Sequence, residues 1–259
     1  MQLHPIQEIT ILPGKNRDGT REGFDRITIS PGDTLSVVGP TGSGKTALIS
    51  DIEMFAREDT ITKRTILVNG TYPPEHFIRN PAQKPVALIT QNTKCLSDML
   101  VSEFLDMHIK SRKIQEEGIA KKTIILANEF TGEEIRAEAR MTSLSGGQTR
   151  SLMIADAIII SDAPIILLDE VENAGIFKER VMSCLKNHQK ALIFVTHDLL
   201  ISLLSGRRIV MKNGGIEKVL EPKDQEKDAL AWITGIDATI CRMRELIRSG
   251  ELVRSVCPG

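Results

Sequence analysis

The sequence lacks any hydrophobic run long enough to cross a membrane. A helix that spans a bilayer needs about 20 consecutive apolar residues, and the apolar stretch that ends at Ile160 is interrupted at once by Ser161 and Asp162. The first residues, Met1 to Pro5, also lack the basic segment followed by an apolar segment that marks a signal peptide. We therefore expect a cytoplasmic protein.

Neither an excess of charge nor a pattern of paired cysteines is present. The 33 Lys and Arg residues nearly balance the 34 Asp and Glu residues, which gives no electrostatic reason to expect nucleic acid or an acidic membrane as a partner. Cys95, Cys184, Cys241 and Cys257 are far apart and form no C-x-x-C pair. This spacing is typical of reduced cysteines and favours neither disulfides nor a metal cluster.

A glycine-rich segment gives the clearest indication of chemistry. Residues 39–46 read Gly-Pro-Thr-Gly-Ser-Gly-Lys-Thr and fit G-x-x-x-x-G-K-[ST], the phosphate-binding loop of nucleotide hydrolases. The apolar, β-branched residues 34–38 before it predict a buried strand. Residues 47–56 after it contain no Gly or Pro and predict a helix with Leu48, Ile52 and Phe55 on one face. The motif requires this order of strand, loop and helix.

Each part of the loop has a physical role. Its glycines let the backbone curl so that successive N–H groups point at phosphate oxygens, and the positive end of the following helix dipole adds to the attraction. We expect Lys45 to bridge the β- and γ-phosphates and the Thr46 hydroxyl to bind Mg²⁺. The predicted nucleotide-binding residues of this segment are Gly39, Pro40, Thr41, Gly42, Ser43, Gly44, Lys45, Thr46 and Ala47.

Strand-like and helix-like segments alternate along the chain, which predicts an α/β fold with a mostly parallel sheet and flanking helices. The expected strands are residues 6–12, 24–29, 34–38, 64–68, 85–90, 165–168 and 191–195, with a closing hairpin over 208–220. The expected helices are residues 47–56, 101–110, 120–128, 132–140, 149–160, one around 181–185, and 199–204. The long connection at about 92–160 predicts an inserted helical lobe. We expect one P-loop domain over 1–222 and a helical extension over 223–259.

Polar residues follow several of the expected strands. Gln91 ends one strand, Asp169 and Glu170 end another, and His197 follows a third. Ligands of parallel sheets bind at the carboxyl ends of the strands. The sequence therefore predicts that these side chains lie close to the phosphate-binding loop.

Residues 144–148, Leu-Ser-Gly-Gly-Gln, precede an apolar helix and the strand that ends in Asp169-Glu170. This segment resembles the signature of the ATP-binding cassette (ABC) family. Gln91 resembles the family's Q-loop residue and His197 its switch histidine. Together with the phosphate-binding loop, five elements occur in the family's order, and the resemblance covers residues 6–221. It implies the P-loop NTPase fold with a small antiparallel β portion and the helical lobe.

The resemblance implies an ATPase with ATP and Mg²⁺ as cofactors. Glu170 would accept a proton from the attacking water or orient it, and His197 would contact the γ-phosphate. Gln91 would reach the metal or the water with a neutral amide. The catalytic residues implied are Glu170, His197 and Gln91, and the metal ligands are Thr46, Gln91 and Asp169.

The resemblance also implies a second copy of the chain. In the family two cassettes meet head to tail, so that the signature of one contacts the γ-phosphate held by the other. The signature residues expected to do so here are Ser145, Gly146, Gly147 and Gln148. The resemblance favours the ATP-hydrolysing subunit of a transporter whose membrane-spanning subunits are separate chains. Such a subunit would lie peripherally on the inner face of the membrane. A soluble ABC ATPase that remodels or activates a partner protein is the alternative. Intact Glu170 and His197 argue against a dimer that binds ATP but scarcely hydrolyses it.

Three departures mark a divergent member of the family. No aromatic residue precedes Phe24, although the family commonly stacks one on adenine upstream of the phosphate-binding loop, and Phe24 suits the core better. Ile176 stands where the D-loop usually has Asp. The helix after the signature begins Thr149-Arg150-Ser151, and Asp156 replaces a common Arg.

The tail, residues 222–259, lies outside the resemblance. Its apolar residues recur at helical spacing and include the single tryptophan of the chain. The predicted helix packs either on the surface of its own cassette or against a partner, including a second copy. The apolar residues concerned are Leu230, Trp232, Ile233, Ile236, Ile240, Met243, Leu246 and Ile247.

Overall fold

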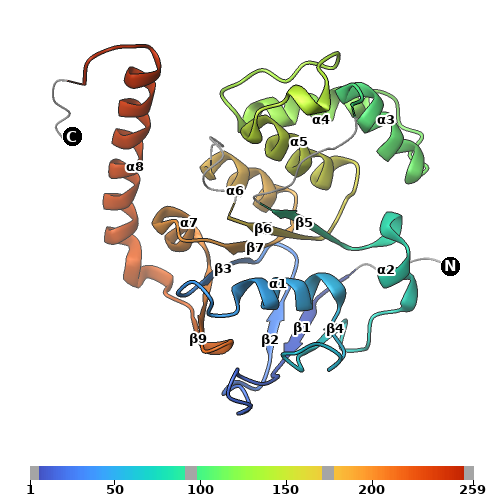
Figure 1. Cartoon of the computed structure of the whole chain (residues 1–259), viewed down its shortest axis with the longest axis vertical. Helices are drawn as coiled ribbons and strands as arrows, with labels where there is room; N and C mark the ends of the chain where they lie inside the picture. Colours follow the sequence, from blue (N-terminus) through green and yellow to red (C-terminus); the bar gives the residue numbers. More distant parts are fainter. Residues whose placement is uncertain (1–5, 91–97, 171–177, 254–259) are drawn as a thin grey trace.

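A computed structural model of the chain describes residues 6–90, 98–170 and 178–253 (Figure 1). Its main sheet has six strands in the order β5-β6-β7-β3-β8-β9. Neighbouring strands are parallel except β8 and β9, which form an antiparallel hairpin. The strands are β3 (Thr34–Val38), β5 (Val86–Thr90), β6 (Ile165–Asp169), β7 (Ala191–Val195), β8 (Arg207–Lys212) and β9 (Gly215–Leu220).

A smaller antiparallel sheet lies beneath the main one in Figure 1, with α1 between the two. Its strand order is β2-β1-β4, and the strands are β1 (Ile9–Leu12), β2 (Ile27–Ile29) and β4 (Thr65–Val68). Helix α1 (Lys45–Met54) follows the glycine-rich segment directly. The predicted α/β P-loop fold with a small antiparallel portion is confirmed.

Hydrophobic residues are buried on both faces of the main sheet, because successive side chains of a strand point to opposite sides. In β6, Ile165 and Leu167 join the core shared with α1 and the small sheet, whereas Ile166 and Leu168 join the core beneath the helical lobe. Parallel strands covered on both faces need such continuous apolar runs. The two cores therefore cover the main sheet on both faces.

Among residues 98–170, three helices follow β5 and precede β6. They are α3 (Val101–Ser111), α4 (Ile119–Phe130) and α5 (Gly146–Ile159), and α5 packs closely on α4. The remaining helices are α2 (Glu75–Arg79), α6 (Lys178–Asn187), α7 (Leu199–Leu204) and α8 (Lys227–Arg248), with short 3₁₀ turns at Pro81–Gln83, Met141–Ser143 and Lys223–Glu226. No helix among the described residues has the length and apolarity needed to cross a membrane.

The helix predicted over residues 132–140 was wrong. Its backbone groups are engaged outside a helix, since the Asn128 side chain bonds both the N–H and the C=O of Ile135 at 2.7 and 3.1 Å. The carbonyls of Ala137 and Ala139 accept bonds from the first N–H groups of α3. A charged sequence alone does not reveal such long-range partners. The short helix α2 was also missed, because no element was expected between the strands at 64–68 and 85–90.

Candidate functional site

The glycine-rich segment forms a tight loop between β3 and α1, at the carboxyl edge of the sheet. Gly42 and Gly44 have positive φ angles of 76° and 101°, in the region that favours glycine. A Cβ atom on Gly39 would lie 2.4 Å from the Met211 carbonyl oxygen, and one on Gly44 would lie 3.0 Å from Gly214. These glycines are therefore required by the close approach of the β8–β9 hairpin as well as by the curl of the loop.

Lys45 begins α1 and is buried. Its ammonium donates to the carbonyl oxygens of Gly39 and Pro40, at 2.8 and 3.1 Å. The charge therefore lies within the curve of the loop, where a bound phosphate would supply a stronger, charged acceptor. Thr46, the next residue, is exposed in the first turn of α1. The hydroxyl of Ser43 is buried and has no hydrogen-bond partner in the structure as described.

The outer side of the loop is braced by two distant segments that sequence reasoning missed. The Arg17 guanidinium donates to the Gly42 carbonyl at 2.8 Å. The N–H of Gly214 donates to the Ser43 carbonyl at 3.0 Å, and the N–H of Arg17 donates to the Asn213 carbonyl at 2.8 Å. Arg17 thus places a positive charge at the phosphate-binding loop. Arg17 lies between the expected strands 6–12 and 24–29, in a polar segment where no local pattern marks this arginine.

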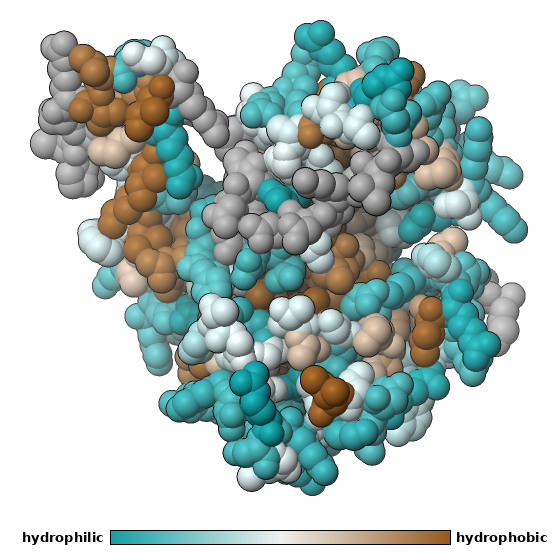
Figure 2. Space-filling view, in the orientation of Figure 1, coloured by the Kyte–Doolittle hydropathy of each residue, from teal (hydrophilic) through white to brown (hydrophobic). Residues whose placement is uncertain are grey.

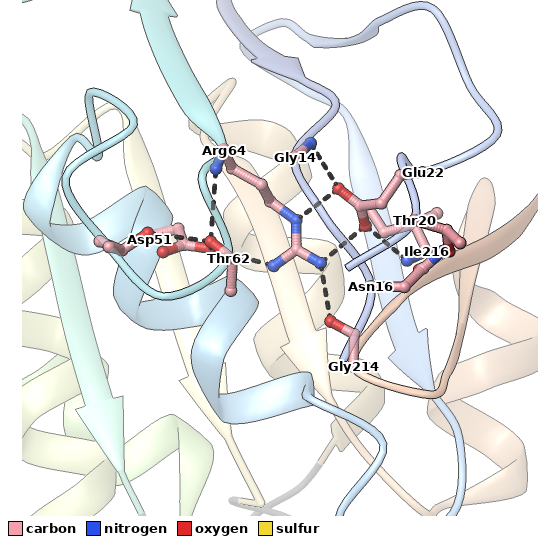
Figure 3. A network of polar contacts seen from close by, with 10 residues as sticks. Gly14, Asn16, Thr20, Glu22, Asp51, Thr62, Arg64, Gly214 and Ile216 are labelled. Carbon is pink, nitrogen blue, oxygen red and sulfur yellow. Dashed lines mark hydrogen bonds and ion pairs between the residues drawn. The ribbon is translucent and has the colours of Figure 1, made fainter. Parts of the chain in front are cut away.

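A buried ionic cluster supports the same elements (Figure 3). Arg64 directly precedes β4 and is fully buried. It pairs with Glu22 at 2.7 Å and with Asp51 of α1 at 2.9 Å. It also donates to the Gly214 carbonyl at 3.2 Å. The Glu22 carboxylate accepts from the backbone N–H groups of Gly14 and Ile216. The cluster therefore joins α1, the 14–22 loop and the hairpin in one network behind the phosphate-binding loop.

Asp169, Glu170 and His197 lie at the ends of neighbouring strands. Asp169 of β6 is in register with Val195 of β7, and Glu170 has a positive φ of 51° while its N–H donates to the Val195 carbonyl at 2.9 Å. The Nε2 atom of His197 lies 3.8 Å from the Glu170 carboxylate. Both side chains are partly exposed, which leaves them accessible to a ligand.

The position of His197 is fixed by the helix that follows it. The Asp198 carboxylate caps α7 by accepting from the N–H of Ile201 at 3.0 Å. The same carboxylate pairs with Lys178 of α6. This ion pair ties the segment after β7 to α6, and so limits the movement of the histidine.

The signature segment begins α5 in the helical lobe. Ser145 is the N-cap of α5, and its hydroxyl accepts from the N–H of Gln148 while the Gln148 side chain bonds back to the N–H of Ser145. The Ser145 hydroxyl donates to the Glu133 carboxylate at 2.7 Å. Gly146 is exposed and Gly147 is buried. The positive end of the α5 dipole therefore faces outward, with one carboxylate beside it.

Two predicted residues lie outside the described part of the chain. They are Gln91 and Ile176, and the structure describes Thr90, which pairs with Asp169 across β5 and β6. Phe24 packs against the core, as predicted, although it precedes β2 instead of lying within it. The sequence itself offers no aromatic residue upstream of Phe24 that could stack on adenine.

The chain is similar to known proteins over most of its length. A family model for ABC transporters matches residues 25–173. An uncharacterised ABC transporter ATP-binding protein, MJ0121 of Methanocaldococcus jannaschii, is 48% identical over 95% of this chain and 94% of its own length. The spermidine/putrescine import ATP-binding protein of Mannheimia succiniciproducens is 30% identical over 86% of this chain, and the match covers 60% of that importer.

The fold agrees with a solved structure of an ATP-binding cassette. The cassette MJ0796, a dimer in a post-hydrolysis state with ADP and Pi, matches with a TM-score of 0.61 at 21% identity, over 82% of this chain and 98% of its own. None of these similarities supports the alternative of a soluble ATPase outside transport. The chain belongs to the ABC transporter family, as a subunit that binds and hydrolyses ATP.

Proposed function

We propose that two copies of the chain hydrolyse ATP between them, each phosphate-binding loop facing the signature of the other copy. One observation carries this proposal. The signature segment bonds the Glu133 carboxylate and the Glu134 backbone carbonyl. The phosphate-binding loop instead bonds Arg17, the β8–β9 hairpin and its own Lys45. The exposed start of α5 is thus a second anion-binding end, which a nucleotide held by another copy would complete.

The residues at the sheet edge fit a magnesium ion. Mg²⁺ prefers hard oxygen ligands such as hydroxyls and carboxylates. Thr46 follows β3 and Asp169 ends β6, with one strand, β7, between them. We assign the metal to these two side chains and to Gln91. The ion would neutralise charge on the β- and γ-phosphates when bound.

Glu170 and His197 supply the remaining chemistry. The Glu170 carboxylate would accept a proton from the water that attacks the γ-phosphate, and His197 would hold the developing charge on that phosphate. Their separation of 3.8 Å lets a single water contact both. Lys45 exchanges its bonds to Gly39 and Pro40 for the β- and γ-phosphates.

The proposed unit is the cassette of residues 1–222 with its lobe at about 92–160, followed by the extension 223–259. Separate membrane-spanning subunits would bind beside the edge strand β5, and thereby hold the chain at the inner face of the membrane. A cleft there is lined by both apolar and charged side chains. They include Ala87, Leu88, Arg112, Met153 and Asp156.

Nucleotide-driven pairing tests the proposal. The Glu170→Gln variant removes the proton acceptor but keeps the shape of the site, so it should bind ATP, hydrolyse it about 10²-fold more slowly and elute as a dimer in gel filtration with ATP. Lys45→Ala should lose tight ATP binding and stay unpaired under the same conditions. A Glu170→Gln protein that binds ATP and still elutes as a monomer contradicts the head-to-tail arrangement.

The membrane partner needs a separate experiment. Affinity purification of the tagged chain from membrane and soluble fractions should recover a polytopic membrane protein from the membrane fraction. Recovery of a soluble enzyme complex alone would contradict docking on membrane-spanning subunits. The docking cleft can be tested in the same way with Met153→Asp, which should reduce that recovery.

A further inference from the structure

The last helix, α8, carries an apolar band along one side. Its residues Trp232, Ile236, Ile240, Met243 and Ile247 recur every three or four positions, which places them on one face. Trp232 is 68% exposed and Ile247 is 65% exposed. None of the α8 side chains with a described environment is buried. Figure 2 shows the band as a brown strip along this helix.

The base of α8 is fixed to the cassette by polar contacts that leave the band uncovered. Glu226, just before the helix, pairs with Arg208 of β8 at 2.8 Å. Asp237 lies 3.5 Å from Lys178, the residue that also pairs with Asp198. Among the described elements, α8 packs on α7 and on the 3₁₀ turn at Lys223–Glu226. Its second half extends past α7 and away from the sheet (Figure 1).

We propose that α8 of a second copy covers this band, and that the two helices pair antiparallel about a twofold axis at Ile240. The charges of the helix complement themselves in this orientation. Where the two helices overlap about this axis, over residues 232–248, the first half carries Asp237 and is net negative, whereas the second half is net positive. Its charged residues are Arg242, Arg244, Glu245 and Arg248. Antiparallel pairing sets each negative half beside a positive one.

The spacing of the band fits the same occupant. Residues 236, 240, 243 and 247 alternate steps of four and three, the pattern that lets two helices interlock their side chains. Ile240 at the axis would meet its own copy, and Ile236 of each chain would lie between Met243 and Ile247 of the other. A membrane surface fits less well, because helices that lie on membranes carry a predominantly basic polar face.

The pairing requires no nucleotide. Two helices in contact over about four turns bury less surface than the roughly 1,200 Å² of a stable interface, so α8 alone gives a weak dimer. ATP bound between the same two cassettes would then close a contact within one assembly, at a raised effective concentration. Asp237 of α8 and Asp198 share Lys178 as a partner. The first half of α8 therefore lies next to the segment that holds His197.

Sedimentation of the full chain without nucleotide tests the inference. In a Lys45→Ala background, the average mass should rise from monomer toward dimer with concentration. Ile240→Asp should weaken this association at least about tenfold, because it places a charge at the centre of the contact. Ala238→Asp is the matched control, since residue 238 is exposed and lies about 200° round the helix from 240. Circular dichroism should confirm that both variants keep their fold.

Several outcomes overturn the inference. A monomer at all concentrations does so, and so do equal losses for Ile240→Asp and Ala238→Asp. Binding to anionic phospholipid vesicles that depends on Ile240, with the protein monomeric, would identify a membrane as the occupant instead. These measurements contain no ATP, so they fail or succeed separately from the ATP-driven pairing of Glu170→Gln.

Disulfide cross-linking tests the orientation. With Cys241→Ser to remove the neighbouring thiol, Ile240→Cys should form an intermolecular disulfide under mild oxidation, because the twofold axis brings the two positions together. Ala238→Cys in the same background should not. A dimer in which mass spectrometry finds no link between the two introduced thiols at position 240 contradicts antiparallel pairing.

Discussion

The Nε2 atom of His197 lies 3.8 Å from the carboxylate of Glu170, although the two residues come from different strands. The parallel pairing of β6 and β7 sets this distance, because Asp169 and Val195 are in register. Replacing the imidazole should leave ATP binding intact and lower hydrolysis by about 10²-fold. A phosphate-release assay on His197→Ala measures this. His188→Ala, an exposed histidine on the turn after α6, should hydrolyse ATP at the original rate.

Arg17 should contribute to nucleotide affinity. Its guanidinium bonds the Gly42 carbonyl, so Arg17→Ala removes a positive charge and a brace from the phosphate-binding loop. A charge-assisted hydrogen bond contributes about 1.5–3 kcal/mol, which corresponds to an ATP affinity roughly 10-fold or more lower by calorimetry. Arg21→Ala removes an exposed charge from the same loop and is the control. Equal affinities for the two variants would show that Arg17 acts only through overall charge.

The buried cluster around Arg64 should be a large contributor to stability. Arg64→Met leaves the Glu22 and Asp51 carboxylates buried without their cation, and breaking a buried pair in this way costs about 3–5 kcal/mol. Urea unfolding should show this loss. The exposed pair of Arg79 and Glu75 gives the comparison, since Arg79→Met should change stability by less than about 0.5 kcal/mol. A small loss for Arg64→Met would mean that the two carboxylates are protonated or hydrated when unpaired.

Glu133 should oppose ATP-driven pairing. Its carboxylate accepts a hydrogen bond from the Ser145 hydroxyl at 2.7 Å, beside the end of α5 that would meet a γ-phosphate. Glu133→Gln removes the negative charge, so less ATP should be needed to form the dimer of the Glu170→Gln protein. Glu134→Gln is a matched control, because the Glu134 carboxylate pairs with Arg136 instead. An unchanged ATP requirement in the Glu133→Gln variant would show that the Glu133 carboxylate of the original protein does not oppose pairing.

Acid should loosen the base of α8. Hydrogen bonds from Arg208 lower the pKa of Glu226 below its ordinary value. A carboxyl whose pKa is lower in the folded state stabilises the fold above its ordinary pKa, and this contribution is lost as pH falls through the lowered value. Fluorescence of Trp232 in α8 should therefore change at acidic pH, below the usual titration range of glutamate. In Glu226→Gln this pH-dependent step should be absent.

The sequence by itself determined the order of most elements and the chemistry of the short motifs. Residues 34–56 specify strand, glycine loop and helix locally, because hydrophobic periodicity and glycine torsions act over a few residues. The continuous apolar runs at 165–168 and 191–195 predicted strands, and the structure confirms both. The helical spacing of the tail likewise predicted α8.

Only the tertiary structure decided which distant segments meet at the phosphate-binding loop. Arg17 reaches Gly42, and Gly214 reaches Ser43, through contacts whose partners are far apart in the chain. Residues 132–140 have the composition of a helix, yet their backbone groups bond Asn128 and the start of α3 instead. Such contacts depend on strand order and packing, which no local pattern encodes, whereas motifs and periodicity depend on neighbours in sequence.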